Sequence, residues 1–154
     1  MKTLLCSSIL LFLFSCNMHT DENISNSSQT ISNTDELINS VKNEKGKFTV
    51  DNSTAGFLHL MENTVINFRD MAKKRNPPVN IYNEFSVLLD RNIEHVRENC
   101  RMKGEGHDRL VSILEKISQY NKEIEGNDLA KTRLAFGQIL VLINEMNNTF
   151  DYRN

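Results

Sequence analysis

Several motifs that mark common functional classes are missing from this chain of 154 residues. It has no Cys-x-x-Cys-His segment for covalent haem, no glycine-rich phosphate loop and no nucleophile elbow. No glutamate stands three positions before His59, His95 or His107, which excludes the Glu-x-x-His pairs of di-iron bundles. Internal repeats are also missing, which argues against a solenoid. We therefore do not expect an enzyme.

A large excess of charge of one sign is also missing. The chain contains 18 Lys and Arg against 20 Asp and Glu, a formal net charge of −2. No continuous block of basic residues is present, as a nucleic-acid or anionic-headgroup site would favour. We expect a mildly acidic surface and no nucleic-acid partner.

An apolar run near the start of the chain predicts a secretion signal. The run that ends at Phe14 covers about 11 residues, whereas a bilayer span needs roughly 20. Leu13, Ser15 and Cys16 then resemble a bacterial lipobox, with an aliphatic residue at −3, a small residue at −1 and cysteine at +1. Phe14 at −2 is bulkier than usual. We expect residues 1–15 to be a cleaved lipoprotein signal peptide, with an uncleaved membrane anchor as the alternative.

The same pattern predicts where the protein resides. Cys16 would carry palmitate-type acyl chains on its thiol and amine, and these are sufficient for stable membrane anchoring. Asn17 follows it, in place of the Asp associated with inner-membrane retention in some Gram-negative bacteria. We expect a lipid-anchored protein of the cell envelope, in the outer membrane and facing the periplasm.

Cysteine is scarce, with three in the chain. Cys6 would leave with the signal peptide and Cys16 would be alkylated, so Cys100 would remain alone and no intrachain disulfide could form. A lone thiol in an oxidising compartment must be buried, bound to a ligand or able to link two chains. The thiol of Cys100 is therefore a candidate ligand, although buried cysteine also behaves as a small hydrophobic residue.

The chain divides into a linker and a helical domain. Residues 16–47 are rich in Asn, Ser, Thr and acids, which is typical of a flexible linker. Residues 48–154 carry apolar residues at steps of three and four, which predicts four amphipathic helices. We expect these helices at residues 54–74, 80–102, 107–125 and 129–150. Short connections make the fold an all-α, up-down-up-down four-helix bundle.

The expected topology gathers sulfur and imidazole side chains at one end of the bundle. The turn between the second and third helices contains Cys100, Met102 and His107, and antiparallel packing brings His59 and Met61 to the same end. His95 and Met146 would lie nearby. Thiolate, thioether and imidazole suit Cu(I), and thiolate with imidazole suits Zn(II).

A purely structural interpretation accounts for the same residues. Gly104 is a typical helix terminator, and Gly106 is a flexible entry to the next helix. Cys100 extends the apolar stripe of the second helix. Met61 and Met146 lie on or beside core stripes, where methionine usually serves packing. Asp108 beside His107 suits the first turn of a helix.

Two stretches of the chain, HVRENCRMKGEGHDRLVSILEKI and FGQILVLINEMNNTFDY, resemble a poorly characterised family of small bacterial envelope proteins. That family carries a Cys-x-Met-x-Gly-x-x-His-x-x-Leu signature between its second and third helices. The resemblance covers residues 46–154 and implies a four-helix domain. Val111 replaces a second histidine common in the pattern, and Glu115-Lys116 replaces a proline. The matching positions here are Cys100, Met102, Gly104, His107 and Leu110.

Two functions follow as hypotheses. The first is binding of copper or zinc by Cys100, Met102 and His107, with His59 and Met61 as further ligands. The second is a scaffold or adaptor lipoprotein that binds no metal and docks another envelope protein through its helical domain.

Overall fold

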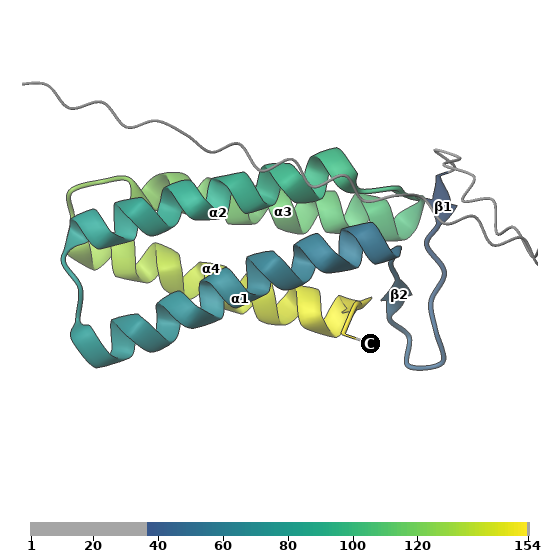
Figure 1. The fold of residues 1–154 in the computed structure, drawn as a ribbon, viewed down its shortest axis with the longest axis horizontal. Coiled ribbons are helices and arrows are strands. Elements are labelled where there is room, and N and C mark those ends of the chain that lie inside the picture. The colour runs from purple at the N-terminus through teal and green to yellow at the C-terminus, as the bar shows by residue number, and fades with distance from the viewer. Residues whose placement is uncertain (1–36, 154) are drawn as a thin grey trace, which may run out of the picture. The chain divides into compact units, whose positions relative to one another are not determined.

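The computed structural model describes residues 37–153. The predicted signal peptide, the lipidated Cys16 and the first part of the predicted linker lie outside these residues. Four helices and four two-residue strands follow one another along the described chain (Figure 1). They are β1 (Ile38–Asn39), β2 (Phe48–Thr49), α1 (Asn52–Arg75), α2 (Val79–Asn99), β3 (Met102–Lys103), α3 (Glu105–Ile124), α4 (Leu129–Thr149) and β4 (Phe150–Asp151).

Local side chains determine where the helices begin and end. The Asp51 carboxylate accepts a hydrogen bond from the Thr54 amide at 2.9 Å and so caps α1. Asp128 caps α4 in the same way by accepting from the amides of Ala130 and Lys131. At the other end of α1, Asn76 adopts a left-handed conformation with φ of 44°, and its amide bonds to the Ala72 carbonyl. The two prolines that follow prevent α1 from continuing into α2.

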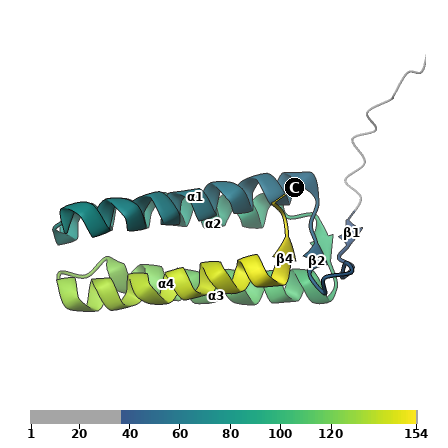
Figure 2. The ribbon, with the colours of Figure 1, turned by 90° about the horizontal axis from the view of Figure 1, so that it is seen from below.

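The helices pack in chain order. α1 packs on α2, α2 on α3, and α3 on α4. Figure 2 shows α1 and α2 in one layer and α3 and α4 in a second layer. The prediction of an all-α domain with four helices is confirmed. No helix within residues 37–153 is long and apolar enough to cross a membrane.

The second helix ends earlier than predicted. α2 stops at Asn99, whereas the apolar stripe predicted a helix to residue 102. Cys100 already has extended backbone, and Met102 in β3 pairs in parallel with Ile38 in β1. The Ile38 amide donates to the Arg101 carbonyl at 2.7 Å. The helix ends at Asn99 because the backbone groups that follow it hydrogen-bond to a distant segment of the chain.

Residues 37–47 therefore belong to the folded region, although their composition predicted a linker. Besides β1, this segment forms a bridge between Lys42 and Phe48, and the Thr49 amide donates to the Val41 carbonyl at 2.9 Å. The neighbouring strand β2 pairs in parallel with β4 at the end of the chain. Backbone hydrogen bonds, and not apolar side chains, hold the segment in place, so its polar composition gave no sign of it.

One hydrophobic core runs through the four helices. Phe68, Tyr82, Phe85 and Phe136 stack together with ring centroids 4.2 to 6.0 Å apart. Phe48, Phe150 and Tyr152 are also buried, and most of the other large core side chains are aliphatic or thioether groups, among them Leu58, Met61, Leu89, Ile93, Leu110, Ile113, Leu114, Ile117, Ile124, Ile139, Ile143 and Met146. Each of the four helices contributes to this core, as the predicted stripes required.

Gly106 allows the segment before β2 to approach α3. The Gly106 amide donates to the Ser40 hydroxyl at 3.0 Å, and that hydroxyl donates to the Lys103 carbonyl at 3.0 Å. A Cβ atom at position 106 would lie 2.4 Å from the Ser40 Oγ atom and 3.0 Å from the Phe48 ring. These distances are too short for any residue other than glycine, so Gly106 is required by packing.

We expect Gly106→Ala to lower the free energy of unfolding by about 1 to 3 kcal/mol, the usual cost of overpacking. Gly137 is the matched control, because a Cβ atom there would meet nothing within 4 Å. Gly137→Ala should raise stability by about 0.5 to 1 kcal/mol, since alanine is the better helix former. Urea denaturation of both variants measures the effects. Equal stability changes of the same sign at the two glycines would contradict this account of Gly106.

Candidate functional site

The residues predicted to bind a soft metal lie at the α2–α3 end, but most of the sulfur is inside the core. Met61 and Met146 are fully buried, and Met102 is 3% exposed. Cys100 is a free, half-buried cysteine that packs against the same core. The structure thus brings the four sulfur-containing residues into one hydrophobic cluster, where their contacts are those of packing side chains.

The three histidines of this end each contact a different neighbour. His107 lies in the first turn of α3, and its Nδ1 atom is 3.3 Å from the Asp108 carboxylate. The ring of His59 meets the ring of Tyr152 edge-on, with centroids 5.3 Å apart. His95 stacks on Phe57 at 5.6 Å.

Across residues 37–153, no group of three or more His, Cys, Asp or Glu side chains is arranged to hold a metal ion. Metal binding by Cys100, Met102 and His107, with His59 and Met61, stays a prediction. A metal held by thioethers would require buried methionines to leave the core.

A buried carboxylate that the sequence analysis missed organises the side of the domain where α1 meets the C-terminal tail. Glu62 in α1 is 8% exposed. Its oxygens accept hydrogen bonds from the Asn147 amide at 2.8 Å and the Tyr152 hydroxyl at 3.2 Å, and they pair with the Arg153 guanidinium. Burial and the adjacent Glu62 charge raise the pKa of the Tyr152 hydroxyl, which therefore remains a donor.

The role of this cluster is structural. All three partners of Glu62 come from the last turn of α4 or from the tail beyond it, so they fasten that tail to α1. The sequence carried one signal of this cluster. Glu62 lies between the core residues Met61 and Val65, and a buried acid needs hydrogen-bonding partners. The partners could not be named from the sequence, since they lie at least 85 residues away.

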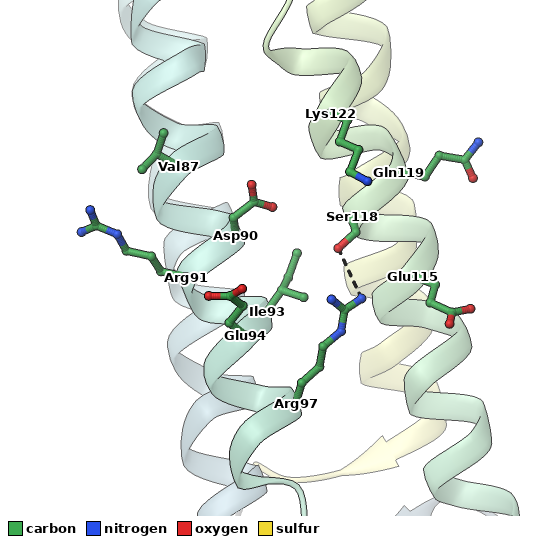
Figure 3. A pocket seen from close by; sticks show the side chains of 10 residues that line it. All are labelled: Val87, Asp90, Arg91, Ile93, Glu94, Arg97, Glu115, Ser118, Gln119 and Lys122. Carbon is green, nitrogen blue, oxygen red and sulfur yellow. Dashed lines mark hydrogen bonds between the residues drawn. The ribbon is translucent and has the colours of Figure 1, made fainter.

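A surface hollow of about 600 Å³ lies between α2 and α3. Figure 3 shows its charged side chains arranged along both helices. Arg97 donates to the Ser118 hydroxyl across the hollow. Three acids and three bases alternate around it, so it favours neither sign of ligand; they are Asp90, Glu94, Glu115, Arg91, Arg97 and Lys122.

Comparisons with protein-family models, curated proteins and solved structures find no match for this chain. The resemblance to a family of envelope proteins therefore stays a prediction that rests on the signature residues.

The buried position of the sulfur atoms leads to a prediction about copper. We expect the purified full chain and its Cys100→Ser variant to compete equally with a colorimetric Cu(I) chelator under reducing conditions, because the nearby thioethers are inside the core. Met102→Leu, which keeps the size of the core side chain, should also leave the competition unchanged. A one-to-one Cu(I) complex that is lost in both variants would establish the metal site instead.

Proposed function

We propose that the protein is a lipid-anchored envelope protein whose up-down-up-down helical bundle docks another envelope protein. The observation that carries this proposal is the burial of Met61, Met102 and Met146. These methionines act as core, so the end of the domain that had suggested a metal site serves to close the fold. The function then rests with the outer surfaces of the helices.

Those surfaces offer apolar side chains to a partner. Leu60, Val87, Leu88, Leu134 and Val141 are each between 48% and 71% exposed. They occur on α1, α2 and α4, and Val87 lines the α2–α3 hollow together with Asp90 and Arg91. Apolar anchors within a polar rim are typical of non-obligate protein interfaces. Soft-metal binding is the competing proposal, and it depends on Cys100, which is the half-buried member of the sulfur cluster.

The anchor itself is testable with two cysteines. Cys16→Ser should abolish incorporation of a clickable palmitate analogue and move the protein out of the outer-membrane fraction, because the acylated thiol is lost. Cys6→Ser is the matched control and should keep both properties. Membrane incorporation of the Cys16→Ser protein at the level of the wild type would show that the apolar segment, and not a lipid, holds the protein.

Docking is testable in intact cells with the full lipidated chain. A photoreactive amino acid at Val87 on α2 or at Leu134 on α4 should give a discrete adduct with one envelope protein, since both side chains are at least half exposed. The same envelope protein should co-purify with the wild type. A lipid-anchored chain that ends at residue 47 should recover none of it. If neither labelled variant gives an adduct although both variants are folded, the docking proposal is wrong.

A further inference from the structure

The edge between α1 and α4 is fastened at its two ends. Asn76, after the last turn of α1, accepts a hydrogen bond from the Arg133 guanidinium at 2.5 Å. At the opposite end, Glu62 accepts from Asn147 at 2.8 Å. Figure 2 looks onto this edge and shows the two helices facing each other along their length. Elsewhere α1 packs chiefly on α2, and α4 on α3.

Two neighbouring hollows, of about 580 and 340 Å³, occupy this edge and share Arg69 and Leu140 in their walls. Both hollows lie between α1 and α4, and we call them together the α1–α4 groove. Its central walls are Ile66, Arg69 and Lys73 from α1, and Arg133, Gly137 and Leu140 from α4.

The charge of the α1–α4 groove is positive, although the whole chain has a formal charge of −2. Its charged wall residues are four bases (Arg69, Lys73, Arg133 and Arg153) and one acid (Glu62). That acid is paired with Arg153, and Arg69 is paired with Asp70 at 2.9 Å. Lys73 and Arg133 remain to meet an acidic ligand. The α2–α3 hollow, by contrast, balances three acids with three bases. The groove is therefore complementary to an acidic ligand.

The floor of the groove is apolar. Leu140 and Phe136 lie in it, and Gly137 leaves room because a Cβ atom there would meet nothing within 4 Å. Leu134 and Val141, spaced at i−3 and i+4 from Gly137, extend this helix face outward with exposed fractions of 71% and 60%. An occupant must therefore present apolar side chains as well as acids.

The length of the groove favours a helical ligand over a membrane surface. From Glu62 to Asn76, α1 rises about 21 Å, which is close to four helical turns. A helix lying along this length can present apolar residues to Phe136 and Leu140 and charges to the bases on either side.

We infer that the α1–α4 groove binds an amphipathic helix with acidic flanks, supplied by the partner protein. This inference rests on the docking function proposed above and names the surface and the chemistry of the partner. Apolar residues at i, i+3, i+4 and i+7 of that helix contact Ile66, Gly137 and Leu140. Its acids pair with the groove cations Lys73 and Arg133.

The test uses a fluorescent amphipathic peptide of about 18 residues, or about 27 Å of helix, with leucines on one face and glutamates beside them. Fluorescence anisotropy with the full chain in a non-ionic detergent measures its Kd. We expect binding that weakens as salt rises from about 0.05 to 0.3 M, because screening shortens the range of the charges. A peptide with lysines in place of the glutamates should not bind.

Two pairs of variants locate the site. Lys73→Glu with Arg133→Glu should raise the Kd roughly tenfold or more, as reversal of complementary charges does. Arg91→Glu with Lys122→Glu in the α2–α3 hollow is the matched control and should leave the Kd unchanged. Gly137→Phe should block the groove sterically, whereas Gly137→Ala should bind as the wild type does. Thermal melts show whether each variant is folded.

Several results would overturn the inference. One is a lysine peptide that binds with the same Kd as the glutamate peptide. Another is an unchanged Kd for groove variants that melt as the wild type does. A third is binding of phosphatidylglycerol vesicles by a protein that does not bind the glutamate peptide. Failure of the docking function is distinguishable from these. If the cellular adduct at Val87 or Leu134 persists while the peptide does not bind, docking stands and the groove is not its site. If no adduct forms, docking itself fails.

Discussion

The attachment of the C-terminal tail to α1 through Glu62 is the constraint on which the arrangement of this domain depends. A carboxylate at 8% exposure is costly unless its oxygens are satisfied, and Asn147, Tyr152 and Arg153 satisfy them. The same contacts bring the chain after α4 back across the end of the helices, where β4 pairs with β2. A single buried acid thus links the first helix, the last helix and the small strands. It also fixes the separation of α1 and α4 at one end of the groove between them.

The helices were predictable because their signals are local. Apolar residues at steps of three and four, capping acids at positions 51 and 128, and the two adjacent prolines all act within a few residues of the boundary they determine. Residues 47–50 alternate in polarity, which is typical of an extended segment and agrees with β2. The pairing of the strands was not predictable, because each contains two residues and pairs with a segment at least 60 positions away. The early end of α2 has the same origin. Its stripe continued through Cys100, but backbone pairing with Ile38 outweighed the helical preference.

The candidate metal site illustrates how residue type and position can suggest different roles. Met61, Met102 and Met146 all belong to the hydrophobic core, which extends through the four helices. Their convergence on a single site stays a prediction. Burial decides how these side chains are used, and it depends on the face of each helix and on the pairing of β1 and β2, which the sequence did not reveal. The histidines of the same end contact Tyr152, Phe57 and Asp108. The groove cations were invisible for a related reason, since they are dispersed in sequence and meet only across two antiparallel helices.

The parallel pairing of β1 with β3 has a mechanical consequence. The chain enters the described domain at residue 37, and the first bonds it makes are those of the Ile38 amide to the Arg101 carbonyl and of the Ser40 amide to the Lys103 carbonyl. Any tension transmitted along the preceding chain acts on this β1–β3 ladder before it reaches a helix. Because few backbone bonds hold the ladder, it would yield well before the helical core is disturbed. Loss of this pairing would free the chain only as far as Ser40, because Lys42, Asn43 and Lys47 are bound separately to Glu105, Asp151 and Asn147. The tether would then lengthen by a few residues while the four helices stay intact.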